Sequence, residues 1–401
     1  MITFVISKFT EKQAKLDEWF IDLQNPIVLV TNESLKNEFS SFENVITFEK
    51  FSADYNLELQ IEKLHKEKTI DSIIAFDESI IDRVSVIRER LGIKGQHSYS
   101  GNAFRNKILM KNIINQAHLP TAKYKQIETV YDIYDFITDV GYPVIIKPID
   151  GLASFDTSKI NNEEELTAWL KTNTLKNNMI EEYIDGDIYH CDGIIINGKL
   201  KFFTAFKYVN TCLDALKQGG VGDLLIDKNS NLFQDLYNYT KKVLTAMPTP
   251  PTTTFHLEVF RVNNNALIFC EIASRTSGAL VPDIIKLAYN LDMNRYIARA
   301  QAGIEERLKI EESPYLYASF HMPLTSGTLV TKVEYNEMSL PWCVYFDCSC
   351  EEGKYYNPTA YYHSYVEFIV KGETENQVMN NLQKTIDYIN TNTVWLSTET
   401  V

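Results

Sequence analysis

The chain has 401 residues, 45% of them hydrophobic and 23% charged, which is the composition of a globular protein with room for two or three domains. Its formal net charge of −14 argues against nucleic acid or an anionic membrane as a partner. No apolar run is long enough to span a bilayer, and the chain starts with a strand-like segment rather than a leader. Together with scattered cysteines, these features predict a cytoplasmic protein.

Residues 1–100 alternate apolar, strand-like runs with stretches of helical spacing. Strands are predicted at Ile2–Ser7, Ile27–Val30, Val45–Phe48 and Asp71–Phe76, and helices at Glu11–Leu23 and Ile80–Leu91. Such alternation is typical of a parallel sheet with crossover helices. Because no Gly-x-Gly-x-x-Gly motif follows the first strand, we interpret residues 1–100 as a Rossmann-like, substrate-side domain that binds no dinucleotide.

One acidic pair in this domain, Asp77 and Glu78, follows the carboxyl end of a predicted strand. Open α/β sheets bind ligands at that edge, so Glu78 is a candidate for contact with substrate. The more common alternative is an acidic pair that complements the N-terminus of the next helix.

The next segment carries two lysines that suit a phosphate ligand. Lys107 lies in a predicted helix, Phe104–Ala117, and Lys147 ends the apolar strand Pro143–Pro148. A buried lysine needs an anion, and the glycine- and serine-containing loop after Lys147 offers N–H and hydroxyl groups to one. The loop lacks the Gly-Lys-Ser/Thr of a Walker A motif. A lysine that reaches from a strand end into solvent is an alternative of equal weight.

Further along, Asn197-Gly198 lies between two apolar runs and predicts a β-hairpin. The glycine-rich segment Lys217–Gly222 suits either a mobile lid over phosphates or an ordinary surface loop, and the residues favour neither.

Two strand-like runs near residue 260 each carry one carboxylate. Phe255–Arg261 contains Glu258, Ala266–Arg275 contains Glu271, and three asparagines lie at the turn between them. If the glutamates face each other, their like charges are destabilising unless a proton or a cation lies between them, and paired carboxylates suit Mg²⁺. The alternative is a surface hairpin with two solvated glutamates.

The turn length decides between these two interpretations. A two-residue turn at Asn264 and Asn265 predicts the cross-strand pairs Glu258–Glu271, Phe260–Phe269 and Val262–Leu267. A three-residue turn over 263–265 predicts that the glutamates lie on opposite faces.

In chain order, these motifs resemble the ATP-grasp superfamily over about Gly101 to Leu291. The motifs are Lys107, Val144–Pro148 with its small-residue loop, Glu181–Gly186, Glu258 and Glu271. Tyr189–Gly193 and Cys270–Arg275 are similar to the branch that holds L-amino acid ligases and related carboxylate–amine ligases.

The resemblance implies a fold that combines α/β and α+β parts, namely an ATP-grasp fold with a Rossmann-like N-terminal domain. After residues 1–100, it implies a lid and linker region at 101–185 and a core with the metal strands at 186–305. A C-terminal α+β part at 306–401 would complete that core.

The resemblance also implies ATP and Mg²⁺ as cofactors, with Mn²⁺ as an alternative metal. Glu258 and Glu271 match the metal ligands, while Arg275 and Lys147 match the catalytic residues. The positions that match the nucleotide site are Lys107, Lys147, Ser154, Glu181, Glu182, Tyr183, Ile184 and Asp187.

The activity so implied is ATP-dependent carboxylate–amine ligation through an acyl-phosphate, with release of ADP and phosphate. The partners would be a small carboxylate, such as an amino acid, and an amine, without nucleic acid or membrane, in a monomer or homodimer. Two alternatives stay open, namely acyl transfer to the thiol of a carrier protein and a degenerate ATP-binding module without turnover.

Two positions depart from the family pattern. Ala273 stands where many relatives have a metal-binding asparagine, and Ile188 stands where many have a glutamate for the ribose, so Asp187 or Asp192 is a candidate substitute. His256 shares the strand face of Glu258 by alternation, which makes it a better substrate candidate than His190. The full set of substrate candidates is His256, His190, Lys207 and Glu78.

Overall fold

The computed structural model describes residues 1–210, 219–357 and 364–396. The N-terminal part is a parallel sheet in the order β3-β2-β1-β4, as the alternation of strands and helices predicted. Its strands are β1 (Ile2–Ile6), β2 (Ile27–Asn32), β3 (Val45–Phe48) and β4 (Ile70–Ala75). Its helices are α1 (Leu16–Trp19), α2 (Asn56–Glu67), α3 (Ile81–Leu91) and the short 3₁₀ segments Glu33–Phe39 and Glu78–Ile80.

The helices of this part differ from the prediction at two places. The helix expected over Glu11–Leu23 is a single turn, α1. Its apolar residues Leu16 and Trp19 are buried together with Phe20 in one cluster rather than along a continuous helix face. The helix α2 was not predicted, since it presents a narrow buried stripe, Leu57 and Ile61, on an otherwise polar segment.

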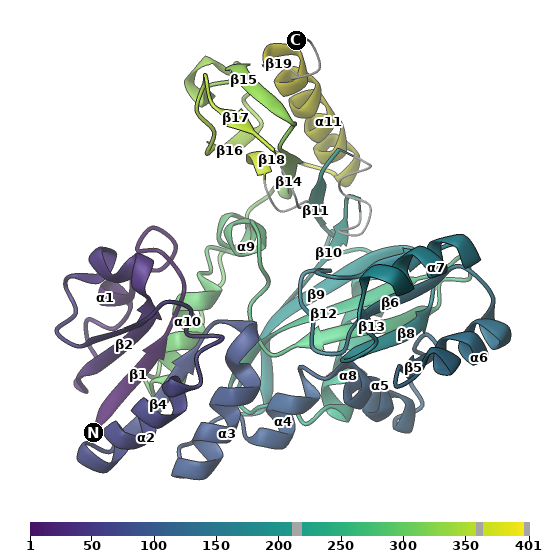
Figure 1. Ribbon diagram of the computed structural model, residues 1–401. Helices are drawn as coiled ribbons and strands as arrows, with labels where there is room; N and C mark the ends of the chain where they lie inside the picture. Colours follow the sequence, from purple (N-terminus) through teal and green to yellow (C-terminus); the bar gives the residue numbers. More distant parts are fainter. Residues whose placement is uncertain (211–218, 358–363, 397–401) are drawn as a thin grey trace.

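A second, antiparallel sheet has the order β5-β8-β6-β7. It comprises β5 (Tyr124–Gln126), β6 (Val144–Pro148), β7 (Ser158–Ile160) and β8 (Asn178–Glu182). The helices α6 (Val130–Val140) and α7 (Glu163–Thr172) share an apolar core with it, and α4 (Ser98–Ala103) and α5 (Lys107–Gln116) precede it. In Figure 1 this sheet, labelled β5, β6 and β8, lies over the strands β12 and β13 of the next sheet.

The largest sheet has eight strands in the order β13-β12-β9-β10-β11-β14-β18-β16. Those strands are β9 (Asp187–Ile196), β10 (Lys199–Tyr208), β11 (Val221–Leu225), β12 (Thr253–Arg261), β13 (Leu267–Ala273), β14 (Leu316–Pro323), β16 (Cys343–Cys348) and β18 (Ser364–Gly372). The pairing of β11 with β14 joins the central body to the C-terminal lobe, which stands above it in Figure 1.

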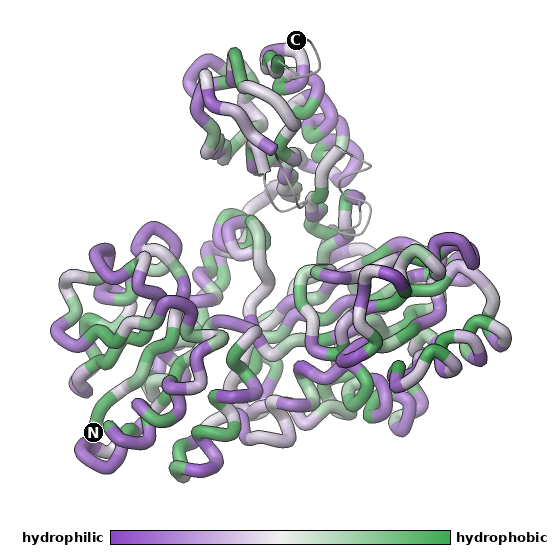
Figure 2. Tube along the Cα trace, in the orientation of Figure 1, coloured by the Kyte–Doolittle hydropathy of each residue, from purple (hydrophilic) through white to green (hydrophobic). Residues whose placement is uncertain are grey.

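The remaining elements cover this sheet and complete the lobe. They are α8 (Asn231–Ala246), α9 (Val281–Tyr289), α10 (Met293–Gln301), α11 (Glu375–Asn392), a 3₁₀ turn at Tyr335–Glu337 and the small sheet of β15 (Gly327–Thr331), β17 (Tyr355–Tyr356) and β19 (Val394–Leu396). Apolar segments gather along the strands, and hydrophilic ones mark the outer loops (Figure 2). No helix in the described ranges is long and apolar enough to cross a membrane. Of the glycine-rich segment predicted as a lid or surface loop, Lys217 and Gln218 lie outside the described residues, while Val221 and Gly222 begin β11.

Candidate active site

The hairpin of β12 and β13 brings Glu258 and Glu271 opposite each other, although its turn differs from the two-residue turn considered first. The turn spans three residues, 263–265. The Val262 N–H donates to the Ala266 carbonyl over 3.1 Å, and Asn265 has a left-handed φ of 63°. The expected pairs Phe260–Phe269 and Val262–Leu267 are therefore wrong.

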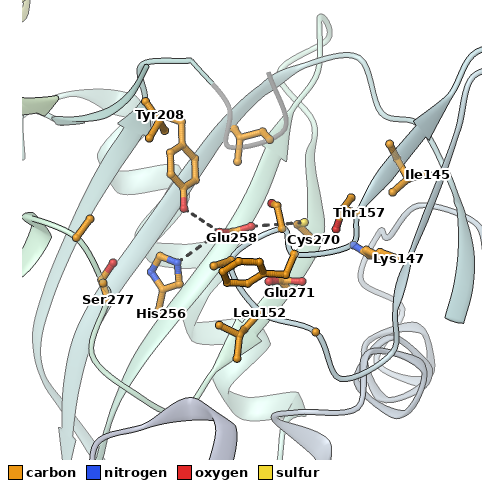
Figure 3. A pocket seen from close by; sticks show the side chains of 18 of the residues that line it. Ile145, Lys147, Leu152, Thr157, Tyr208, His256, Glu258, Cys270, Glu271 and Ser277 are labelled. Atoms are coloured by element: carbon orange, nitrogen blue, oxygen red, sulfur yellow. Dashed lines mark hydrogen bonds and ion pairs between the residues drawn. The ribbon is translucent and has the colours of Figure 1, made fainter. Parts of the chain in front are cut away.

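A β-bulge restores the pairing of the two glutamates. Val259 pairs with Phe269 while Glu258 pairs with Glu271, so Cys270 is the extra residue between them. An odd turn length moves the two carboxylates to opposite faces, and the bulge shifts the register by one more residue and returns them to the same face. Both side chains point into one cavity, as Figure 3 shows.

This cavity has a volume of about 570 Å³ and lies between the β5–β8 sheet and the largest sheet. Most of the residues predicted for the site line it. They are Lys107, Lys147, Ser154, Glu181, Glu182, Tyr183, Ile184, His256, Glu258, Glu271 and Arg275.

A buried ion triad forms one wall of the cavity. The Glu181 carboxylate lies 2.7 Å from the Lys147 ammonium and 2.5 Å from that of Lys111. Lys111 is fully buried and also donates to the Cys270 carbonyl over 3.0 Å. Lys111 was not among the residues predicted for the site, although it lies one helical turn after Lys107, on the same face of α5.

The electrostatics keep this wall charged. Burial alone would raise the pKa of Glu181, but Lys111 and Lys147 lower it below its ordinary value. Burial alone would lower the pKa of Lys147, but the neighbouring Glu181 carboxylate raises it above its ordinary value. The Glu181–Lys147 pair thus remains ionised and presents Lys147 to the cavity with its position held by Glu181.

The carboxylates of Glu258 and Glu271, on β12 and β13, are placed where they could bind a divalent cation. Burial works to raise the pKa of Glu271, but Lys107, Lys147 and Lys111 lower it to about 2, so this carboxylate is ionised at neutral pH. Its Oε2 lies 3.4 Å from the Lys107 ammonium, and Glu258 accepts a 2.8 Å hydrogen bond from Tyr208. Two carboxylates directly opposite on one sheet face are a suitable ligand pair for Mg²⁺ or Mn²⁺.

The loop after Lys147 has the backbone geometry of an anion cradle. Ala153, Ser154 and Asp156 have φ values of 50°, 54° and 56°, a left-handed conformation that is uncommon for side-chain-bearing residues. A tight turn of small residues can present backbone N–H groups to an anion. Ala153 and Ser154 line the cavity, and the Lys107 ammonium donates to the Gly151 carbonyl over 2.6 Å, so the loop is tied to the start of α5.

Glu78 belongs to the support of Arg275 rather than to the cavity lining. Its Oε2 accepts hydrogen bonds from Nε of Arg275 over 2.6 Å, and its Oε1 lies 2.8 Å from Nη1 of Arg105. Arg105 in turn donates to the carbonyl of Asp150 in the phosphate-side loop. Glu78 was predicted to contact substrate, and in the structure it lies between two arginines and does not line the cavity.

We expect Glu78→Gln to lower kcat about tenfold, because loss of one charge-assisted contact of about 1.5–3 kcal/mol releases Arg275 from its position. The KM for ATP should change less than twofold, since the lysines that face the nucleotide side are untouched. Glu62→Gln, which removes an exposed ion pair with Arg90 in the same domain, is the matched control. A higher KM for ATP in Glu78→Gln, with kcat unchanged, would contradict the positioning role.

His190, His256 and Asp192 form a buried network beside the metal strands. Asp192 is fully buried and lies 2.6 Å from His190 Nδ1 and 3.0 Å from His256 Nδ1, while His190 Nε2 lies 3.1 Å from Asp223. His256 reaches the cavity, and its Nε2 lies 3.4 Å from Glu258 (Figure 3). His190 does not reach the cavity, because its ring stacks on Phe206 in the interior, so its expected contact with substrate is not supported.

The His190 network predicts a stability loss at high pH. Burial alone would lower the pKa of His190, but Asp192 and Asp223 raise it to about 10. Because the folded pKa lies above the ordinary value of about 6.5, this stabilisation is fully present below pH 6.5 and is lost as the pH rises toward 10. We expect His190→Gln to flatten that part of the pH profile of thermal unfolding. An unchanged slope would show that His190 is neutral in the fold.

Of the remaining positions singled out from the sequence, Asp187, Asp192, Lys207 and Ala273 lie outside the cavity lining and only Ile188 belongs to it. Asp187 and Lys207 form an ion pair with each other over 2.7 Å, and Asp192 is fully buried and does not line the cavity. Ala273, which stands where many relatives have a metal-binding asparagine, pairs with His256 across the hairpin. Ile188 lines the cavity with an apolar side chain.

Comparison with known proteins gives distant sequence relatives, and no family model matches the chain. An L-arginine-specific L-amino acid ligase from Bacillus subtilis is 23% identical over 267 residues, which is 65% of this chain and 64% of that protein. A D-alanine–D-alanine ligase from Clostridium perfringens (strain SM101) is 30% identical over 163 residues, 38% of this chain and 53% of that protein. The matched region thus spans between half and two thirds of these relatives.

Solved structures match over the whole chain. An L-amino acid ligase from Bacillus licheniformis gives a TM-score of 0.78 at 13% identity, covering 100% of this chain and 99% of the other. A carboxyaminoimidazole ribonucleotide synthase from Aspergillus clavatus, solved with ATP, gives 0.73 at 14% identity and covers 97% and 98%. These full-length structural matches show that the chain has the ATP-grasp fold.

Proposed function

We propose that the chain is an ATP-dependent carboxylate–amine ligase that acts on an amino acid or a similar small carboxylate. One observation carries this proposal, namely that two lysines, two opposed glutamates and an arginine line a single cavity. They are Lys107, Lys147, Glu258, Glu271 and Arg275. Cationic groups that stabilise a transferring phosphoryl group, together with carboxylates for a metal, are the parts that phosphoryl transfer requires.

The residues divide into roles along the cavity. Glu181 to Ile184 line the nucleotide side, where strand-end backbone groups suit an adenine. Lys107 and Lys147 face the phosphates, and the left-handed loop at Ala153 and Ser154 offers them N–H groups. Glu258 and Glu271 would hold a divalent cation, which when bound neutralises charge on the phosphate oxygens.

The reaction follows from this arrangement. An oxygen of the substrate carboxylate attacks the γ-phosphorus of ATP while the bond to the bridging oxygen of ADP breaks, and Arg275 stabilises the charge on the transferring group. The amine nitrogen then attacks the carbonyl carbon of the acyl-phosphate, loses a proton and displaces inorganic phosphate. No covalent bond to the protein is needed, so catalysis rests on positioning and charge.

The test is a screen of carboxylate and amine pairs for release of phosphate. We expect ADP and phosphate to form in equal amounts when both substrates are present, with little release when either is omitted. Formation of AMP and pyrophosphate would contradict the proposal. ATP binding without turnover by any pair would favour the degenerate module, and a mass shift of an added carrier protein would favour thiol acylation.

A further inference from the structure

His256 lies on β12 two residues before Glu258, and the proposed reaction leaves its side chain without a role. Alternate residues of a strand share a face, and both side chains point into the cavity, as Figure 3 shows. The cross-strand partner of His256 is Ala273, whose methyl group carries no donor atom. Of this pair, only the imidazole brings a side-chain donor atom to the cavity.

Asp192 fixes the orientation of the His256 ring. Its Oδ1 lies 3.0 Å from Nδ1 of His256, and the ring itself is only 7% exposed. Because Nδ1 faces a carboxylate, it keeps the proton of the neutral ring, and the lone pair lies on Nε2. A histidine that binds a metal usually donates its other N–H to a carboxylate or carbonyl in this way, which fixes the tautomer and raises the basicity of the ring.

The free nitrogen, Nε2, points at Glu258 across a short gap. It lies 3.4 Å from Oε1 of Glu258, which is longer than the roughly 2.7–3.2 Å of an ordinary N–H···O hydrogen bond. Nitrogen and oxygen ligands lie about 2.0–2.2 Å from a bound cation, so two of them are about 3.0 Å apart at a right angle and about 3.4 Å apart at a tetrahedral angle. The observed separation therefore fits two ligands of one cation.

Glu258 has no lysine or arginine beside it within the described ranges. Its contacts there are the Tyr208 hydroxyl over 2.8 Å, the Cys270 thiol over 3.8 Å and His256. Burial alone would lower the pKa of His256, but Asp192 raises it above its ordinary value, so a cation that binds at Nε2 displaces a proton. The charge of Glu258 is thus open to a metal ion in a way that the lysine-paired Glu271 is not.

His190, the other histidine of the buried network, is not available for the same role. Its Nδ1 lies 2.6 Å from Asp192 and its Nε2 lies 3.1 Å from Asp223, so both ring nitrogens are occupied. It also does not line the cavity. Within this network, Nε2 of His256 is the ring nitrogen that faces the cavity.

We propose that His256 is a third metal ligand, which binds the catalytic cation through Nε2 together with Glu258 and Glu271. An imidazole nitrogen is a softer donor than a carboxylate oxygen, so this set favours a first-row transition metal such as Mn²⁺ or Co²⁺ over Mg²⁺. Three protein ligands, with positions left open for other oxygens, are typical of a catalytic rather than a structural metal site. This deepens the proposed ligase function and rests on it for the place of the cation beside the phosphates.

Pulsed electron paramagnetic resonance of bound Mn²⁺ tests the ligand directly. The full chain, with its histidines labelled with ¹⁵N, is mixed with Mn²⁺ and unlabelled ADP, so that a coupling to ¹⁵N reports the protein and not the adenine. We expect the coupling of a directly bound imidazole nitrogen. His256→Gln should remove it and weaken Mn²⁺ binding at least about tenfold, as the loss of a group at a metal site typically does. Competition with Mg²⁺ should show a smaller loss of Mg²⁺ affinity.

His321→Gln is the matched control. His321 also lines the cavity, but it lies on β14, four strands from β12 in the sheet order, and its Nδ1 lies 3.2 Å from Glu367. We expect it to keep the ¹⁵N coupling and the Mn²⁺ affinity. Since the coupling is measured first on the unmodified sequence, the proposal does not depend on the folding of a variant. Bound Mn²⁺ without ¹⁵N coupling, no binding of Mn²⁺, or an unchanged coupling in His256→Gln would each overturn it.

The same samples separate this inference from the ligase function. A ¹⁵N coupling that depends on His256, without phosphate release from any substrate pair, supports the metal ligand and counts against the ligase. Phosphate release from a substrate pair, with bound Mn²⁺ that shows no ¹⁵N coupling, supports the ligase and overturns the role of His256.

Discussion

Glu271→Gln is expected to reduce phosphate release at least about 100-fold while the protein remains folded. In the proposed reaction, the substitution removes one of two opposed carboxylates and with it charge that would hold a divalent cation. The lost stabilisation is of the order of 3 kcal/mol, which corresponds to roughly two powers of ten in rate. The fold should survive, because 29% of the Glu271 side chain is exposed and glutamine keeps its shape.

Three measurements check this expectation: phosphate release, binding of Mn²⁺ by electron paramagnetic resonance with ADP present, and the midpoint of thermal unfolding. Glu258→Gln should behave alike, since Glu258 is the cross-strand partner of Glu271. Glu128→Gln, on an exposed loop, is the control and should leave all three readouts unchanged. Undiminished turnover with glutamine at position 271 would remove this residue from the metal site.

Glu181→Gln is expected to be the most destabilising single change in the site. Glu181 is 4% exposed and lies between the ammonium groups of Lys111 and Lys147. Loss of its charge leaves two buried cations near each other, and breaking a buried ion pair in this way typically costs about 3–5 kcal/mol. We expect a clear fall in the denaturant midpoint and weaker ATP binding, because Lys147 loses the group that positions it.

A second variant distinguishes the charge effect from a change of shape. Lys111→Met combined with Glu181→Gln removes one of the two cations and should recover part of the lost stability. Glu182→Gln, at the next residue, is the matched control, since this half-buried glutamate accepts from the backbone N–H of Lys123 rather than from a buried lysine. Equal stability of Glu181→Gln and Glu182→Gln would show that the triad does not hold the wall together.

Many residues of the candidate site could be predicted because the patterns that mark them lie within short segments of the sequence. A lysine at the end of the apolar strand β6, a loop of small residues and one glutamate in each strand of a hairpin are patterns within a few residues. The parallel N-terminal sheet was predictable for the same reason, since β-branched runs alternate with helical spacing. The family resemblance then supplied the order of the motifs.

The pairing of the glutamates was predicted for a reason that the structure corrects. The three-residue turn by itself places Glu258 and Glu271 on opposite faces, and the bulge at Cys270 returns them to one face. A bulge is set by the partners that the strand meets, here β9 on one side of β12 and the Lys111 contact to the Cys270 carbonyl, so a pattern in the hairpin does not contain it.

By itself, the sequence determined the strand and helix types, the cationic strand end and the residue types that can hold ATP and a metal. The tertiary structure alone decided which charges are compensated. It placed Lys111 in the interior against Glu181, placed Glu78 between two arginines and buried His190. Each of these outcomes depends on a contact between segments far apart in the chain, and only packing determines whether a charged side chain meets a partner, solvent or a ligand.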